Sequence, residues 1–218
     1  MHRRHFLATG LGSIVAATAA GSGAAGEGPA GDGPRPQPAG KGFAADPAGM
    51  KLCVKPVMTN ILHSGTWEGP CRWNRVTVEQ EKTHAEQRFA GWSKQLRQKG
   101  LGRPEDVRLL EPAHVTFSEK FVLAKDQLDR VARDAAQTDA FFIYPSGSSV
   151  AAFEIGERFK KPILLVGLGC RNVDIAAYTR AKGNEAFVAA DSAELAGMLS
   201  LLRARKVFTE TRVLFPTD

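Results

Sequence analysis

From residue 51 to the end of the chain, short apolar runs alternate with longer amphipathic segments, and this alternation limits the possible folds more than any other feature. Strands that alternate with helices of about ten to twenty residues are typical of βαβ units, which build a parallel sheet with helices on both faces. Because crossover connections are right-handed, the pattern predicts an α/β fold with three layers. We expect a doubly wound, mostly parallel sheet of about five to six strands, flavodoxin-like or Rossmann-like.

Local signals place the individual elements. Apolar runs predict strands at residues 52–58, 107–110, 140–144, 162–167, 186–190 and 211–215. Helical spacing predicts helices over 77–100, 121–135 and 149–160, from about Asn172, and from Asp191 onward. Thr77 with Gln80, and Asp191 with Glu194, are typical of capped helix starts. Pro56 lies inside the first predicted strand, where it suits a bulge or an end position better than the centre of a ladder.

The first twenty residues have the features of an export signal. Arg3 and Arg4 precede Phe6 and Leu7, and a weakly apolar stretch without acidic residues follows, with an A-x-A-like site at residues 17–19. This pattern resembles a twin-arginine signal, which a receptor reads as an address. The alternative is a basic tail before a disordered arm. We expect export, to the periplasm or another extracytoplasmic compartment.

The rest of the chain divides by composition. Residues 21–49 are largely Gly, Ala and Pro, and such a segment buries too little apolar surface to offset its ordering entropy, so we expect a disordered linker. Residues 50–218 fit one α/β domain by size. The last predicted strand lies close to residue 218; either it completes the sheet, or the chain is the first domain of a longer polypeptide.

Charge and cysteine content exclude several classes of protein. The formal charge is +6, or about +4 without Arg3 and Arg4, and the basic residues are interspersed with acidic ones, so we expect no nucleic-acid partner. No run of about 20 apolar residues follows the signal, so we expect no membrane association after its removal. Cys53 fits a strand interior, whereas Cys71 and Cys170 fall in loops and can pair in an oxidising compartment.

Candidate binding residues lie in the loops that follow the predicted strands, because folds of this class bind ligands at the carboxyl ends of their strands. The loops begin at residues 59, 145, 167 and 191. The candidate substrate-binding residues are Asn60, His63, Trp67, Ser146, Gly147, Ser148, Ser149, Arg171 and Asn172.

The serine-rich stretch at residues 145–149 does not form a known catalytic motif. It lacks the bracketing glycines of a nucleophile elbow and the lysine of a phosphate-binding loop. Two interpretations remain. Ser146 or Ser148 caps the following helix, or the helix start also contacts an anion or sugar hydroxyls.

The remaining motifs indicate no catalytic or metal-binding residue. The stretch at 167–172 has two of the three glycines of a dinucleotide fingerprint, and a tight turn with Asn172 as the N-cap explains it better. His63 shares a long loop with one acidic residue, Glu68, which is too few ligands for a metal. His84 and His114 are isolated, so we assign neither a functional role, and we expect His84 on an exposed helix face.

Three stretches, at residues 51–73, 139–149 and 161–170, together with the exported arm, resemble the amino-terminal region of sugar isomerases of the L-fucose and L-arabinose isomerase group. The resemblance covers about residues 50–218. It implies an aldose–ketose isomerase, an intramolecular oxidoreductase, in which later domains bind Mn²⁺. This chain would then be an amino-terminal domain without a cofactor of its own and inactive alone, contributing to a homo-oligomer and to a sugar pocket.

Two functions therefore stay open. One is the amino-terminal domain of such an isomerase. The other is a free-standing exported module that binds a sugar or another small polar ligand.

Overall fold

The computed structural model describes residues 49–65, 76–120 and 123–211, all of which belong to the second of the chain's two units, Lys41–Asp218. The strands are β1 (Leu52–Leu62), β2 (Val107–Leu109), β3 (Ala113–Ser118), β4 (Ala140–Ser146), β5 (Ile163–Val166) and β6 (Ala186–Ala189). The helices are α1 (Val78–Lys99), α2 (Lys125–Ala132), α3 (Val150–Phe159), α4 (Cys170–Ala181) and α5 (Ser192–Glu210).

The strands form one six-stranded sheet in which every pairing is parallel, in the order β2-β1-β4-β5-β6, with β3 also paired to β1. β2 pairs with residues 52–54 of β1, and β3 pairs with residues 57–62. If β2 and β3 are counted as one interrupted strand, the order is that of flavodoxin-like folds. The predicted three-layer, mostly parallel α/β fold is confirmed.

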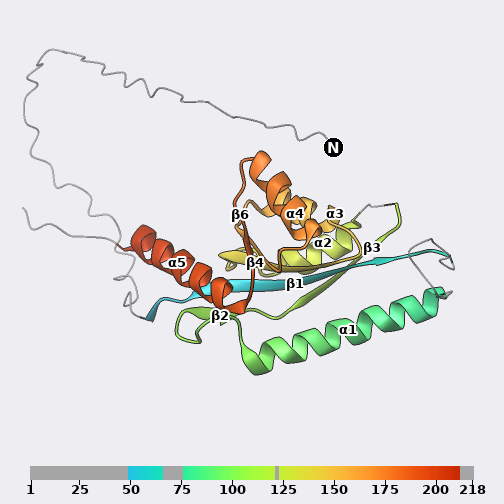
Figure 1. Ribbon diagram of the computed structural model, residues 1–218, viewed down its shortest axis with the longest axis horizontal. Helices are drawn as coiled ribbons and strands as arrows, with labels where there is room; N and C mark the ends of the chain where they lie inside the picture. The colour runs from blue at the N-terminus through green and yellow to red at the C-terminus, as the bar shows by residue number, and fades with distance from the viewer. Residues whose placement is uncertain (1–48, 66–75, 121–122, 212–218) are drawn as a thin grey trace, which may run out of the picture. The chain divides into compact units, whose positions relative to one another are not determined.

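Helices cover both faces of the sheet, with α1 on one side and α2, α3 and α4 on the other (Figure 1). Alternate strand residues point to opposite faces. Ile143 and Leu165 pack with α2, α3 and α4 in one core, and Phe142 and Leu164 pack with α1 and α5 in the other. The loops that follow the strands therefore start from a sheet that is packed on both faces.

β1 is longer than predicted, and Pro56 lies in its interior, so the expectation of a bulge or an end position was wrong. The amide of Leu110 donates to the carbonyl oxygen of Val54 at 2.9 Å, so Val54 faces the β2–β3 side of β1. Because alternate residues of a strand face opposite neighbours, Pro56 faces the same side. There it meets the interruption between β2 and β3, where no strand needs its missing N–H.

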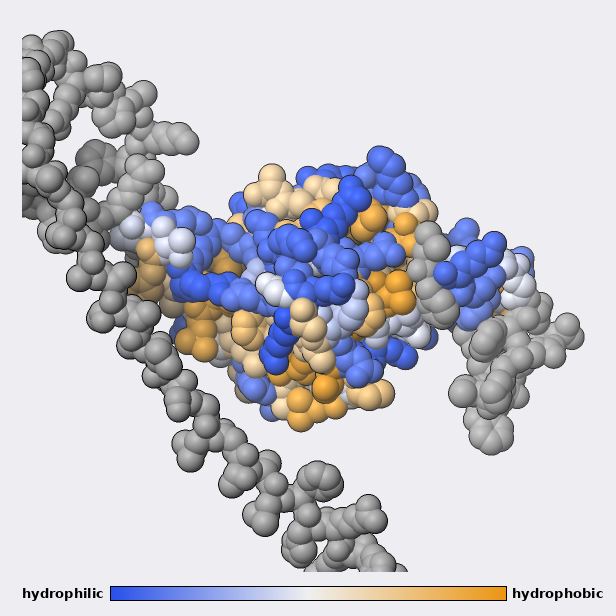
Figure 2. Space-filling view, turned by 90° about the horizontal axis from the view of Figure 1, so that it is seen from above, coloured by the Kyte–Doolittle hydropathy of each residue, from blue (hydrophilic) through white to orange (hydrophobic). Residues whose placement is uncertain are grey.

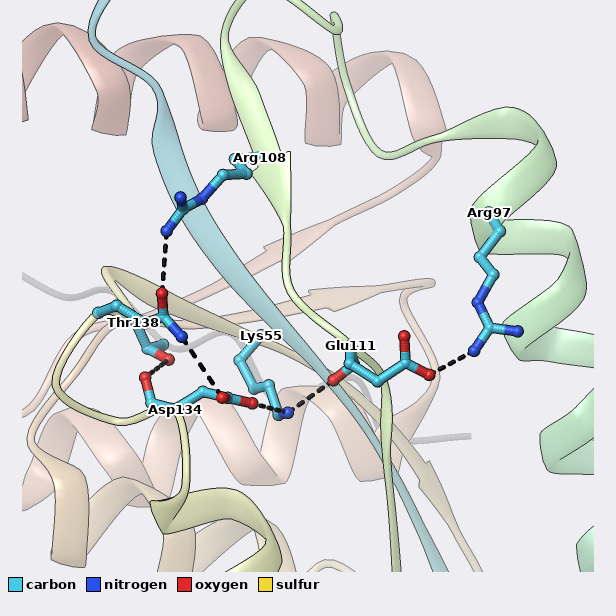
Figure 3. Close-up of polar contacts among 7 residues, drawn as sticks. Lys55, Arg97, Arg108, Glu111, Asp134 and Thr138 are labelled. Atoms are coloured by element: carbon cyan, nitrogen blue, oxygen red, sulfur yellow. Dashed lines mark hydrogen bonds and ion pairs between the residues drawn. The ribbon is translucent and has the colours of Figure 1, made fainter.

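The side chain of Lys55, also in β1, reaches the same interruption between β2 and β3. Its side chain is buried and donates to the carbonyl oxygen of Glu111 at 2.6 Å, while Asp134 forms an ion pair with the same ammonium group (Figure 3). The hydroxyl of Thr138 donates to the carbonyl oxygen of Asp134 at 2.8 Å and holds that turn. A buried charge needs a partner, and this one also satisfies backbone that the broken strand leaves unpaired.

Three other elements differ from the sequence-based expectation. β3 was not predicted, although its buried Ala113, Val115 and Phe117 alternate with half-buried residues as in a strand that is covered on one face. α2 begins at Lys125 and ends at Ala132, so Ala135 lies in the turn after it. Thr211 is the C-cap of α5, and the rest of the predicted last strand lies outside the described residues.

The surface mixes charges with apolar residues. Figure 2 shows one face, on which hydrophilic residues are interspersed with smaller groups of hydrophobic ones. Some charges are paired, as where Arg205 contacts both carboxylate oxygens of Glu185, at 2.5 and 2.8 Å. Among the helices that the structure describes, none combines the length and the hydropathy that a membrane crossing requires.

Candidate functional site

A cleft of about 360 Å³ opens where the carboxyl ends of β1 and β4 meet the first half of α1. Its lining residues are Asn60, Ile61, Val76, Glu81, His84, Ala85, Arg88, Ser146 and Gly147. β1 leads to one edge of the sheet through β2 and β3, and β4 leads to the other edge through β5 and β6. The cleft therefore lies at the point where the strand order reverses, which is the usual ligand position in such sheets.

Two polar side chains come to the cleft directly from the β1–β4 ladder. Asn60 and Ser146 are paired across the two strands. Asn60 is almost fully buried, and its amide nitrogen lies 2.9 Å from Nε2 of His114. Because an amide nitrogen only donates, Nε2 accepts, and the His114 ring is neutral with its proton on Nδ1. Asn60 keeps a carbonyl oxygen and a second N–H for other partners.

The surroundings of His114 favour its neutral form. Burial, with a smaller contribution from the positive charge of Arg130, holds the pKa of His114 below its usual range, against an opposing effect of Glu86. The ring of Phe89 stacks on the imidazole, with centroids 4.8 Å apart. His114 does not line the cleft and acts there only by orienting Asn60.

On the opposite wall, Arg88 of α1 donates from Nη1 to the hydroxyl oxygen of Ser146 at 2.6 Å. The hydroxyl proton of Ser146 is left to donate elsewhere. Gly147, the next residue, has φ +93°, and a Cβ there would overlap Cγ2 of Ile61. Only glycine allows the loop after β4 to pass this close to β1.

Glu81 supplies a carboxylate to the cleft from the first turn of α1. Its Oε2 accepts the backbone N–H of His63 at 2.6 Å, and its Oε1 lies 2.8 Å from Nδ1 of His63. Nδ1 therefore carries a proton, which it donates to Glu81 as a hydrogen bond. This pair ties the end of β1 to α1 and fixes the direction of the carboxylate; His63 does not itself line the cleft.

The structure divides the sequence-predicted residues between several places. Asn60, Ser146 and Gly147 share the cleft. The N-cap residue of α3 is Ser149, which makes no side-chain capping bond, while the hydroxyl oxygen of Ser148 accepts the N–H of Val150, the first residue of the helix, at 3.2 Å. Trp67 lies outside the described residues.

Arg171 and Asn172 line a second and larger cavity, of about 830 Å³, between α1 and α5. The expectation that Asn172 is an N-cap was wrong, because Gly169 holds that position. The amide of Asn172 instead donates to the carbonyl oxygens of Val166 and Gly167, at 2.8 and 2.9 Å, and closes the turn after β5. Cys170, just before them, is exposed; whether it pairs with Cys71 is not tested, because Cys71 lies outside the described residues.

Sequence reasoning missed the α1 side of the cleft. Glu81, His84, Ala85 and Arg88 recur at intervals of three and four residues, which places them along one face of a helix. The polar residues of that stripe were the available signal. His84 is exposed on α1 as expected, but it lines the cleft, although no functional role was assigned to it from the sequence.

The cleft combines an amide, a hydroxyl, a carboxylate and a guanidinium group, so it can donate and accept hydrogen bonds without a strong excess of one charge. Within residues 49–65, 76–120 and 123–211, no three His, Cys, Asp or Glu side chains are grouped to hold a metal ion. The described residues therefore do not fit the Mn²⁺ of the isomerase group, and no metal-dependent step is assigned to them.

No protein-family model, curated protein or solved structure matches this chain. The resemblance to sugar isomerases therefore stays a prediction from the residues.

Proposed function

We propose that this chain is an exported binding module for a sugar or another small polar molecule, held in the cleft at the ends of β1 and β4. The observation that carries the proposal is the pairing of Asn60 with Ser146, which sets an amide and a hydroxyl side by side between Glu81 and Arg88. Each sugar hydroxyl can both donate and accept a hydrogen bond. The side chains of the cleft include acceptors and donors, so they can form both kinds of bond with neighbouring hydroxyls. A volume of about 360 Å³ suits a ligand of monosaccharide size.

Export is part of the proposal. The Arg3–Arg4 pattern and the small-residue site at residues 17–19 support a twin-arginine signal. A module that binds a nutrient-like sugar outside the cytoplasm would need no cofactor of its own.

A second candidate is the amino-terminal domain of a sugar isomerase. It is favoured by the origin of the cleft, because two of the stretches that resemble this family supply Asn60 and Ser146. In that case the cleft forms one wall of a sugar pocket that a homo-oligomer completes, and the chain alone has no isomerase activity.

Calorimetric titration of the purified chain with a panel of pentoses and hexoses, with and without Mn²⁺, tests the proposal. We expect one sugar to bind at 1:1 stoichiometry without metal. Arg88→Gln should weaken binding at least tenfold, whereas Lys94→Gln, which changes an exposed cation of the same helix outside the cleft, should not. Absence of binding by every sugar would overturn the binding module, and Mn²⁺-dependent turnover would contradict the inactivity of the chain alone.

A further inference from the structure

The larger cavity, here called the α1–α5 groove, differs in chemistry from the cleft. It has a volume of about 830 Å³ and runs over β4 and β5 between the two helices. Its floor includes Phe142 and Tyr144 of β4 and Val166 of β5, and Trp92 forms part of the α1 wall. Large aromatic and apolar side chains thus dominate its floor and no carboxylate lines it, although Gln95, Asn172 and Ser192 also contribute polar groups.

The floor of the groove is uncovered although it belongs to the middle of the sheet. Both β4 and β5 have a paired strand on each side, and the faces of parallel sheets are normally covered by helices. Tyr144 is nevertheless 44% exposed and Val166 is 36% exposed. α1 and α5 therefore leave a gap over two inner strands that a ligand can fill.

Aromatic side chains lie both in the floor of the groove and in its α1 wall. The ring centroid of Trp92 lies 6.0 Å from that of Tyr144 and 6.1 Å from that of Phe142, so the three rings form one cluster, in which Tyr144 is exposed and Phe142 is buried. Such a cluster favours a flat, apolar body, because planar groups stack on aromatic rings at these separations.

The charge at the groove is positive. Lys99, at the end of α1, and Arg171, in the first turn of α4, line it and have no ion-pair partner among the residues that the structure describes. Arg103 also lines it but is bound to Asp106 at 2.6 Å. Among the described residues of the lining there is no Asp or Glu. Because α1 runs antiparallel to the strands and α4 begins at their carboxyl ends, Lys99 and Arg171 lie toward opposite ends of the groove.

We propose that the α1–α5 groove is a second binding site, for a planar aromatic organic anion. Trp92 and Tyr144 hold the flat body, and the positive charges of Lys99 and Arg171, one toward each end of the groove, together attract the acidic group. The volume lies within the range of small-molecule sites. A sugar does not suit this surface, since the aromatic floor offers its hydroxyls few partners, so the groove and the cleft select different ligands.

The test compares two matched probes, 2-naphthalenesulfonate and the uncharged 2-naphthalenemethanol, by calorimetric titration of the full chain. We expect the sulfonate to bind at 1:1 stoichiometry, at least tenfold more tightly than the alcohol, with an affinity that falls as salt is added. Equal affinity of the two probes, or no sulfonate binding at millimolar concentration, would overturn the proposal.

Variants then locate the site. Lys99→Glu and Arg171→Glu should each weaken sulfonate binding at least fivefold and leave the alcohol unaffected. Tyr144→Ser should weaken both probes. Lys94→Glu and Arg158→Glu reverse the charge of exposed cations that do not line the groove. These two variants should bind both probes with the affinity of the unaltered chain. Unchanged sulfonate binding by the Lys99→Glu/Arg171→Glu double variant would overturn the assignment.

Misfolding and dimer formation are each checked by a separate control. Circular dichroism and thermal melting establish that each variant is folded. Light scattering reports whether the groove is instead buried between two copies of the chain: a dimer that Tyr144→Arg converts to a monomer would overturn the small-molecule proposal. Sugar binding at the cleft should persist in Tyr144→Ser, so failure of one site is distinguishable from failure of the other.

Discussion

Lys55, in the interior of β1, forms an ion pair with Asp134, and the same ammonium group donates to the carbonyl oxygen of Glu111 at 2.6 Å (Figure 3). Glu111 lies in the interruption between β2 and β3, so one buried charge joins three segments that are distant in sequence. The position of this charge explains why the edge of the sheet tolerates a break between β2 and β3 beside β1.

Lys55→Met should destabilise the protein by about 2–4 kcal/mol, because it leaves the Asp134 carboxylate and the Glu111 carbonyl without their buried donor. Urea denaturation followed by circular dichroism measures the free energy of unfolding. The double variant Lys55→Met/Asp134→Leu should lose less than the sum of the two single changes. As a control, Lys125→Met removes the exposed Lys125–Asp129 pair and should cost less than about 0.5 kcal/mol. Equal losses in the two lysine variants would contradict this role of Lys55.

Acid should weaken the fold partly through Asp134. The hydrogen bond from Lys55 is the main cause that holds the pKa of Asp134 below its usual range, against the effect of burial. With a lower pKa in the folded state, the unfolded chain binds more protons between that pKa and the unfolded value of about 3.9. The contribution is present above about pH 4 and is lost as the pH falls through the folded pKa. Denaturation from about pH 2 to 7 should therefore show a flatter acid limb for Asp134→Asn than for the unaltered chain.

His114 should add a second pH dependence, at higher pH. Burial holds its pKa below the usual value of about 6.5, so the unfolded chain takes up the proton first as the pH falls. The free energy of unfolding should decrease as the pH falls from about 6.5 toward the folded pKa. The resonances of His114 in an NMR titration should move at a pH below about 6.5, and His114→Gln should abolish the corresponding part of the stability change. A midpoint above about 6.5 would show that the ring is charged in the fold and that Asn60 does not donate to it.

Gly147→Ala should destabilise the protein by about 2 kcal/mol and distort the cleft, because the residue has φ +93° and its Cβ would collide with the side chain of Ile61. Adding Ile61→Ala should restore only part of the loss, since the backbone strain remains. Gly91→Ala is the matched control: Gly91 lies in α1 with open space around it, and alanine there should stabilise the helix by up to about 1 kcal/mol. Thermal and urea denaturation compare the variants, and opposite signs for the two substitutions are expected.

Structural features that depend only on residues close together in the chain, such as helix caps, could be predicted from the sequence. The capping box of Thr77 and Gln80, the end of α1 at Gly100 and the cap of α5 at Asp191 were predicted and are present. Each depends on side chains and backbone groups within one or two helical turns, so the local residue pattern contains the necessary information. The alternation of strands and helices, which led to the confirmed α/β class, is local in the same sense.

Only some of the residues that line the cleft could be predicted from the sequence. Asn60 and Ser146 were expected near a ligand because both follow strands, but the residues of α1 opposite them were not. Arg88 reaches Ser146 across 58 residues of sequence, and its contact depends on how far α1 is shifted along the sheet. Helical spacing indicates which side chains share a face of α1 without indicating what that face meets.

By itself, the sequence determined the class of the fold, the helix caps and the strand-end loops, because hydrophobic periodicity and capping act over a few residues. Only the tertiary structure decided that β2 and β3 share one side of β1 around Pro56, that Asn60 is paired with Ser146, and that Arg171 belongs to a different cavity. These relationships follow from the packing of two buried layers against one sheet, in which each contact depends on segments far apart in the chain.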